Sequence, residues 1–181
     1  DMRMNRDSGN TAAELIESAS EVELATIIKE FGEERGARRI ARSICAKGRE
    51  NPMMTTADLR QAVEATSPKM PMKTIARVFQ AIRIWVNEEL RELELGLIAS
   101  TQLLATKGRV AVIAYQSLED RLVKSFFEPL VKGCVCPPRL PVCACGHKSE
   151  FSKILRSRAG AEEIQENQRA RSAIMRVFER I

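Results

Sequence analysis

The chain has 181 residues, of which 44% are hydrophobic and 29% charged, with a formal net charge of +5. This composition is typical of a soluble globular protein, and the length suffices for one ordinary domain with a small insertion, so at most two compact units are expected. No apolar run approaches the ~20 residues of a membrane-spanning helix, which excludes that class. The modest basic excess permits a nucleic-acid partner without requiring one. Because residues 1–10 lack the apolar core of a signal peptide, we expect a cytoplasmic location.

Residues 11–66 are predicted to form a series of short helices. Each start is marked by a hydroxyl residue three positions before a carboxylate, a pattern that satisfies free backbone amides at a helix N-terminus. The three pairs are Thr11 with Glu14, Ser20 with Glu23, and Thr55 with Asp58. The helix that Ser20 opens is expected to end near Gly32, and the next helix to run over residues 33–47.

The predicted helix over residues 33–47 has two distinct faces. Its apolar face carries Ala37, Ile40, Ala41, Ile44 and Cys45. Its opposite face carries arginines at helical spacing, namely Arg35, Arg38, Arg39 and Arg42. Such a face is either solvated and paired with nearby carboxylates or binds nucleic-acid phosphates, and the sequence favours neither.

A long amphipathic helix is predicted over residues 74–104, because apolar residues from Val78 to Leu97 advance in steps of three and four. Pro68 and Pro71 mark the loop before it. Residues 110–115 then form a continuous apolar run, which favours a strand covered on both faces at the centre of a parallel sheet.

The turn Ser117-Leu-Glu-Asp120 after this strand has two compatible interpretations. It has the pattern of a capping box for the next helix, and it lies at the carboxyl end of a strand, where open α/β sheets bind ligands. Near the end of the chain, residues 151–156 and 172–180 predict two strands with a helical turn over 161–166 between them. The short connection favours an antiparallel pair, so the sheet is expected to be mixed.

Four cysteines form two close pairs, Cys134-x-Cys136 and Cys143-x-Cys145, with His147 just beyond them. Four thiolates within twelve residues could hold a tetrahedral zinc ion, and a reducing compartment favours metal over a disulfide. The single residue inside each pair is shorter than the usual zinc spacing, so a reduced surface loop is the alternative. Cys45 is expected in the core.

Several motifs resemble, in order, those of one family. They are Asp1-Met-Arg-Met4, Phe31-Gly-Glu-Glu-Arg35 with Arg39-Ile-Ala-Arg42, Thr55-Thr56 with Leu59, the run FQAIRIWVNEELRELE over residues 79–94, the run KGRVAVIAYQSLEDRLVKSFF over residues 107–127, and residues 167–172. The chain resembles the bacterial S-adenosylmethionine-dependent methyltransferases that modify N4 of a cytosine in small-subunit (16S) ribosomal RNA. The resemblance covers nearly the whole chain and is weakest over residues 129–158.

The resemblance implies a fold and a domain division. The fold would be α/β, the second half of the Rossmann-like sheet of a class I methyltransferase, with an all-helical inserted domain. Residues 1–10 would end the cofactor half, residues 11–73 would form the substrate-recognition insertion, and residues 74–181 would complete the sheet, with a Cys-rich loop at 133–148. Most of the site for S-adenosyl-L-methionine would lie upstream of Asp1. The isolated chain would then be inactive, bind cofactor poorly and associate through its unpaired sheet edge, for example as a homodimer.

The resemblance also implies roles for residues. The reaction needs an aligned amine and a hydrogen-bond acceptor more than acid–base groups, and the target base must leave its stack. The turn of Gln116 and Ser117 with Glu119 would shape the base pocket, with Asn87 facing it. RNA phosphates would be held by Arg38, Arg39, Arg42, Arg77 and Arg83, and more weakly by Arg169 and Arg171.

Four departures from the family pattern leave alternatives open, and one of them is the nonstandard approach to the long helix, Ile75-Ala76-Arg77-Val78. The family usually has Gly-Gly-Arg at residues 107–109, Phe-His-Ser at 115–117 and Asn-Pro-Arg at 167–169, where this chain has Lys-Gly-Arg, Tyr-Gln-Ser and Asn-Gln-Arg. Gln116 matters most, because the imidazole it replaces is a base or a stacking ring. The alternatives are a noncatalytic RNA-binding module derived from such an enzyme, and a methyltransferase of the same fold with another substrate.

Overall fold

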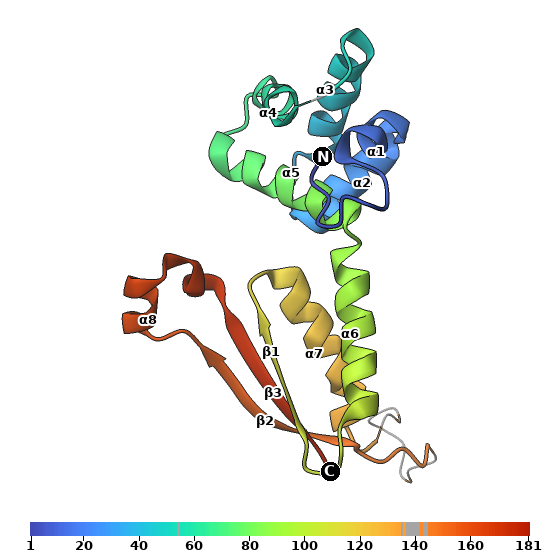
Figure 1. Ribbon diagram of the computed structural model, residues 1–181, viewed down its shortest axis with the longest axis vertical. Helices are drawn as coiled ribbons and strands as arrows, with labels where there is room; N and C mark the ends of the chain where they lie inside the picture. Colours follow the sequence, from blue (N-terminus) through green and yellow to red (C-terminus); the bar gives the residue numbers. More distant parts are fainter. Residues whose placement is uncertain (54, 135, 137–141, 143–144) are drawn as a thin grey trace. The chain divides into compact units, whose positions relative to one another are not determined.

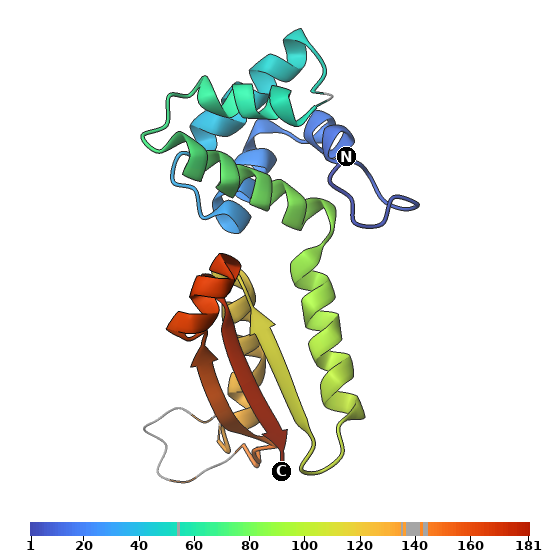
Figure 2. The ribbon, with the colours of Figure 1, turned by 60° about the vertical axis from the view of Figure 1, so that its left-hand side comes forward.

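The chain folds as two compact units, Asp1–Glu89 and Leu90–Ile181. The computed structural model describes residues 1–53, 55–134, 136, 142 and 145–181. The first unit is helical, and the second contains a small sheet with helices (Figures 1 and 2), so the architecture is mixed α/β. The predicted insertion, residues 11–73, lies wholly inside the first unit. Within the described part of the chain, no helix combines the length and hydropathy required to cross a membrane.

Five helices form the first unit, and the three predicted helix starts are confirmed. The helices are α1 (Ala12–Ser18), α2 (Glu21–Gly32), α3 (Ala37–Glu50), α4 (Thr56–Glu64) and α5 (Pro71–Val86). The hydroxyls of Thr11, Ser20 and Thr55 accept hydrogen bonds from amides three residues on, at 3.2, 3.1 and 3.3 Å. These caps satisfy amides that would otherwise lack a partner at each helix start. The third helix starts at Ala37, later than the predicted residue 33, because Glu33 is left-handed with φ 50°.

The core of the first unit forms where α2 packs against α3 and α5. Fully buried side chains from the three helices meet there, among them Leu24, Ile28, Ile40, Ile44, Val78 and Ile82. Gly32 allows the closest approach, because a Cβ at this position would lie 2.8 Å from the carbonyl oxygen of Arg77. Cys45 is only partly buried at the edge of this core, and burial raises the pKa of its thiol.

The single long helix predicted over residues 74–104 is wrong: α5 ends at Val86, and α6 (Glu89–Leu103) begins after a two-residue break. Pro71, expected in the preceding loop, is the first residue of α5, where its missing amide costs nothing. At the break Glu88 is left-handed, with φ 48°. Both the backbone amide and the side-chain amide of Asn87 donate to the Arg83 carbonyl, at 3.1 and 2.8 Å, and so cap the end of α5.

In the second unit, a three-stranded sheet has the order β1-β3-β2. Its elements after α6 are β1 (Arg109–Ala114), α7 (Ser117–Val131), β2 (Phe151–Arg158), α8 (Ala161–Glu166), a 3-10 helix (Gln168–Ser172) and β3 (Ile174–Arg180). The predicted antiparallel pairing of the last two strands is confirmed. Because β1 also pairs antiparallel with β3, the described sheet contains antiparallel pairs alone, and the expected mixed sheet is not seen in it.

One face of this sheet is covered by α7, whose Val123 and Phe127 are buried against Phe151 and Phe178. The rings of Phe127 and Phe178 stack with centroids 3.9 Å apart. Strand β1 was predicted to be central and covered on both faces, but in the described chain it is an edge strand. Its side chains alternate between exposed and sheltered positions, and Ile113 is 54% exposed.

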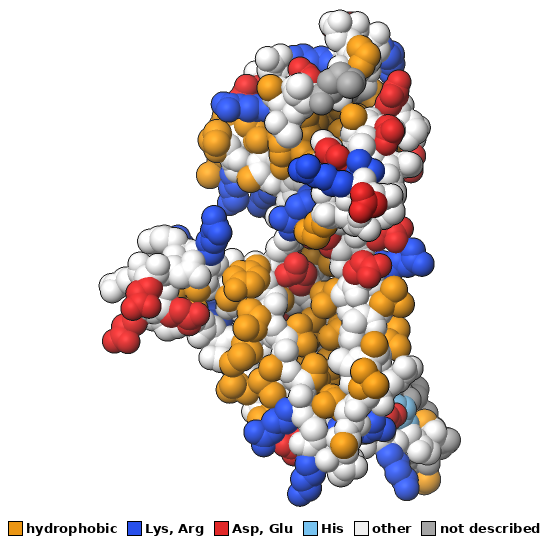
Figure 3. Space-filling model, in the orientation of Figure 1, with side chains coloured by type: hydrophobic (Ala, Val, Ile, Leu, Met, Phe, Trp, Pro, Cys, Tyr) orange, Lys and Arg blue, Asp and Glu red, His pale blue; other side chains and the backbone are white. Residues whose placement is uncertain are grey.

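Large hydrophobic side chains therefore remain exposed on the second unit. Figure 3 shows hydrophobic side chains over the sheet and α6 of this unit. The exposed residues include Leu95, Ile98, Leu103, Ile113, Tyr115, Ile154 and Leu155. Isolated exposed apolar residues are ordinary, but this number on one small unit indicates a surface that another chain segment or partner covers.

Candidate functional site

The turn between β1 and α7 brings together Gln116, Ser117 and Glu119, the three catalytic candidates of the second unit. The carboxylate of Glu119 accepts hydrogen bonds from the backbone amides of Tyr115 and Gln116, at 2.9 and 3.2 Å. The N-cap of α7 is therefore Gln116, one residue before the predicted Ser117. Glu119 fixes the backbone of this turn, which places the Gln116 side chain at the carboxyl end of β1.

The side chain of Gln116 has an unused hydrogen-bonding group. Its Oε1 atom is buried and has no hydrogen-bond partner among the described residues. A buried carbonyl oxygen without a donor is costly, and native proteins seldom keep one without a reason. This oxygen can accept a hydrogen bond from an amine, which is the property required of a group that orients an exocyclic base amine.

Next to this turn, Asp120 forms a bidentate ion pair with Arg176 of β3, at 2.7 and 2.9 Å. The two side chains are 16% and 7% exposed, so the pair is largely withdrawn from solvent. The hydrogen bond from Arg176 lowers the pKa of the Asp120 carboxyl below its usual value, against the opposing effect of burial. The predicted capping partner Asp120 thus anchors the start of α7 to the sheet, a role that the sequence analysis missed because the two residues are 56 positions apart.

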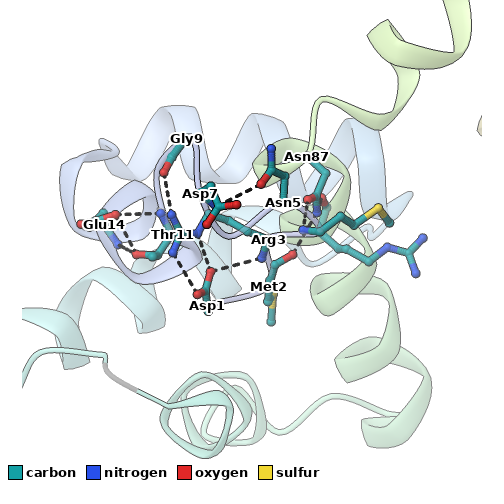
Figure 4. Close-up of polar contacts among 11 residues, drawn as sticks. Asp1, Met2, Arg3, Asn5, Asp7, Gly9, Thr11, Glu14 and Asn87 are labelled. Atoms are coloured by element: carbon teal, nitrogen blue, oxygen red, sulfur yellow. Dashed lines mark hydrogen bonds and ion pairs between the residues drawn. The ribbon is translucent and has the colours of Figure 1, made fainter. Parts of the chain in front are cut away.

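Asn87, the catalytic candidate of the first unit, holds the N-terminal segment (Figure 4). Its Oδ1 accepts from the Met4 amide at 2.7 Å, and its Nδ2 donates to the Met2 carbonyl at 3.0 Å. The Asp1 carbonyl also accepts from the Ala12 amide at 2.8 Å, so both ends of the segment are fixed. In the described contacts Asn87 therefore positions residues 1–4, and a direct role toward a base stays a prediction.

The predicted basic face of α3 borders an open groove between α2 and α3 with a volume of about 910 Å³. Basic residues lining it are Lys29 of α2 with Arg35, Arg38, Arg39 and Arg42. Only Arg42 has a carboxylate partner among the described residues, Glu21 at 3.3 Å, and this ion pair is exposed. The other four have no carboxylate partner among the described residues, so their charges are available to an anion, and phosphate contact by this face stays a prediction.

The remaining predicted RNA-binding arginines lie in different surroundings. Arg77 pairs with Glu34 at 3.4 Å, and Arg83 forms a bidentate pair with Glu89 at 2.7 and 3.1 Å. Both are thus partly neutralised inside the first unit. Arg169 and Arg171 are exposed on the 3-10 helix of the second unit. For these four arginines RNA contact stays a prediction.

Lys29 is the residue of the groove that the sequence analysis missed. It lies on α2, and its only local signal is a cation on the polar side of an amphipathic helix. The packing of α2 against α3 brings it to the arginines, which no local pattern reveals.

Three of the four predicted metal ligands lie together. The Sγ atoms of Cys134, Cys136 and Cys145 all lie within 4.8 Å of one another. The fourth, Cys143, lies outside the described residues. The sequence left a zinc site and a reduced loop as alternatives, and three converging sulfur atoms are a group that could hold a metal ion.

The fold and these sites define a mixed α/β protein. It has a basic helical unit and, at the carboxyl end of β1, a turn in the position where open α/β sheets bind ligands. The whole chain, residues 1–181, matches the MraW methylase family, and the protein belongs to this family. It is 45% identical over 188 residues to the protein named ribosomal RNA small subunit methyltransferase H of Trichlorobacter lovleyi, and 46% identical over 187 residues to the protein of that name of Syntrophotalea carbinolica. A Geobacter protein of the same name is 45% identical.

The matches to all three relatives cover 100% of the chain but 60% of the length of each relative. The resemblance inferred from the motifs is thereby confirmed. The family is one of methyltransferases, and its class I methyltransferase fold agrees with the mixed α/β architecture.

Proposed function

We propose that the complete protein transfers a methyl group from S-adenosyl-L-methionine to N4 of a cytosine in small-subunit ribosomal RNA. The observation that carries this proposal is the identity of 45% over the whole chain to relatives named ribosomal RNA small subunit methyltransferase H. The cytosine, its N4 atom and the methyl donor come from the motif resemblance. The basic groove of the first unit supplies independent support, because four of its cations are free to bind phosphates.

In this proposal the chain supplies the substrate side of a Rossmann-like class I methyltransferase. Residues 1–10 would end the cofactor half, residues 11–73 would recognise RNA, and residues 74–181 would complete the sheet. Two features support an unfinished sheet. Strand β1 is an unpaired edge in the described chain, and Ile113 on it is 54% exposed. Proteins normally pair or cover an apolar edge strand of this kind.

Bound S-adenosylmethionine would supply an activated methyl group on sulfur. The cytosine amine would accept this methyl group on its nitrogen and lose one proton to solvent. The chain's own contribution is to orient the amine. The Oε1 of Gln116 would accept from one N4 hydrogen and so direct the lone pair, while Glu119 holds the turn and Ser117 would help to shape the base pocket.

RNA binding is assigned first to Arg38 and Arg39, which line the groove with Lys29 and Arg35 and have no carboxylate partner among the described residues. Arg42 lines the same groove, and its ion pair with Glu21 is exposed. Phosphate contacts of this kind give affinity and orientation without base specificity. Arg169 and Arg171 would add contacts from the second unit. Arg77 and Arg83 would contribute less, because each already pairs with a carboxylate. Because the proposed substrate is ribosomal RNA, the expected location of the protein is the cytoplasm, where the ribosomes are.

The experiment is transfer of a labelled methyl group by the complete protein to purified small ribosomal subunits, followed by nucleoside analysis. Label in N4-methylcytidine is the expected result. RNA binding without label would favour a noncatalytic RNA-binding module, and label in another nucleoside would favour a different substrate for the same fold. Absence of both binding and transfer would contradict the proposal.

A further inference from the structure

We propose that Cys134, Cys136 and Cys145 are ligands of a single zinc ion at the loop between α7 and β2. This site is separate from the groove and from the Gln116 turn, and it does not depend on the proposed methylation. Three sulfur atoms within 4.8 Å of one another, on residues up to eleven positions apart, form the cluster. Cys134 and Cys145 are exposed, so apolar burial does not explain their convergence.

The spacing of the sulfur atoms matches tetrahedral thiolate coordination. A Zn–S bond of about 2.3 Å in a tetrahedron places neighbouring sulfurs about 3.8 Å apart. The Sγ atoms of Cys145 and Cys134 are 3.8 Å apart. A disulfide bond would require a separation of about 2.05 Å between the two sulfurs and an oxidant to form it. Zinc binding requires no oxidant. Thiolates are also the ligand type that selects zinc over magnesium or calcium.

A backbone hydrogen bond supports the same chemistry. The Cys136 amide donates to the Cys134 Sγ at 3.4 Å. Hydrogen bonds of this kind orient the ligand atoms of metal sites. On binding, each thiol would release one proton to solvent and give a sulfur lone pair to the zinc ion.

The loop also has a structural need for such a link. In the described parts of residues 132–150 there is no helix or strand, and none of these residues belongs to the core of the second unit. The ends of the loop are already joined, because the Glu150 amide donates to the Leu130 carbonyl at 2.8 Å. Irregular loops of this length inside a compact unit need a function or a link, and a metal ion supplies one.

The fourth coordination position is left to Cys143 by the sequence pattern, although the inference rests on the three described thiolates. Cys143 forms with Cys145 the same Cys-x-Cys pair as Cys134 with Cys136. His147 is the competing ligand, since its Nδ1 is buried without a hydrogen-bond partner among the described residues. A Cys143→Ser variant and a His147→Ala variant decide between them, because zinc content should fall in one and stay in the other.

The test is the metal content of the purified chain, measured by mass spectrometry after gel filtration without added metal. We expect about one zinc ion per chain, and visible absorption typical of tetrahedral thiolate coordination after exchange for cobalt. Cys134→Ser and Cys145→Ser should each lose most of the zinc. The matched control is Cys45→Ser, which removes a cysteine of the first unit and should keep the metal.

A variant that fails to fold would not obscure the result, because the native chain supplies a second measurement. A chelator should remove its zinc and expose the loop thiols to a thiol reagent, while circular dichroism of the helices stays unchanged. The assignment would be overturned if the native chain carried no zinc and took up none from a micromolar solution. It would also be overturned if the Cys45→Ser control lost zinc as the ligand variants do. A disulfide between Cys134 and Cys145 in freshly purified protein would overturn it as well.

Discussion

Replacing Arg38 and Arg39 by alanine should weaken binding of small-subunit ribosomal RNA and reduce its dependence on salt. The two guanidinium groups are exposed on α3, line the same groove and have no carboxylate partner among the described residues. Their charge is therefore available to phosphates. Neither side chain belongs to the core of the first unit, so the double variant should fold as the native chain does.

The size of the effect follows from counterion release. Each phosphate contact with a single strand adds about 0.7 to the slope of log affinity against log salt. Loss of two contacts should lower the slope by about 1.4, which corresponds to about 25-fold weaker binding in 0.1 M salt, or about 1.9 kcal/mol. If the arginines were instead solvated and paired, their loss would change affinity by less than a factor of about five.

The assay is fluorescence anisotropy of a labelled small-subunit RNA fragment over a series of salt concentrations. The matched control is Arg60→Ala with Lys132→Ala, which also removes two positive charges. Both control residues already form exposed pairs four residues apart along a helix, with Glu64 and Glu128. The control should keep the slope of the native chain. Equal losses in the two double variants would show that net charge matters and the groove does not.

Substitutions at three further sites test the other contacts. Asp120→Asn should destabilise the second unit by about 3 kcal/mol in urea unfolding, because Arg176 would stay buried without its partner, whereas Glu128→Gln should be nearly silent. Since the pKa of Asp120 is lowered in the folded state, its carboxylate stabilises the second unit at neutral pH, and this stabilisation is lost as pH falls from about 4 through the lowered pKa. A native chain whose stability does not fall in this range would contradict the reasoning. So would an Asp120→Asn variant that loses the same amount of stability in that range. Asn87→Ala should speed hydrogen exchange of the Met4 amide at least about fivefold, while Asn5→Ala, which removes only an acceptor for the Asp7 amide, should leave it unchanged. Glu119→Gln should keep most methylation because one oxygen still accepts from the turn, and Glu119→Ala should lose about tenfold; a Gln variant as inactive as Ala would instead assign the charge to the chemistry.

Local sequence signals predicted the features that depend on neighbouring residues. Thr11 and Thr55 marked helix starts because a hydroxyl and a carboxylate three residues apart satisfy the same free amides. The arginine face of α3 followed from helical spacing alone. The break at Asn87 and Glu88 escaped prediction because apolar residues continue at nearly helical intervals across it, so periodicity does not register a two-residue turn.

Features that depend on distant parts of the chain were not predictable. The groove needs α2 beside α3, and the ion pair of Asp120 with Arg176 needs α7 beside β3, and no local pattern encodes either contact. The apolar run of β1 indicated two covered faces, whereas the described residues shelter only alternate side chains of this strand. This difference is physically consistent with the relatives, because the chain spans 60% of their length and an apolar strand with one open face calls for a partner.

The most direct test of the central claim is mass analysis of small-subunit ribosomal RNA from cells with and without the gene. The account predicts that one cytosine loses its N4 methyl group when the gene is deleted and regains it when the gene is restored. A gene carrying Arg38→Ala and Arg39→Ala should restore less of it. An N4-methylated cytosine that persists unchanged in the deleted strain would contradict the account.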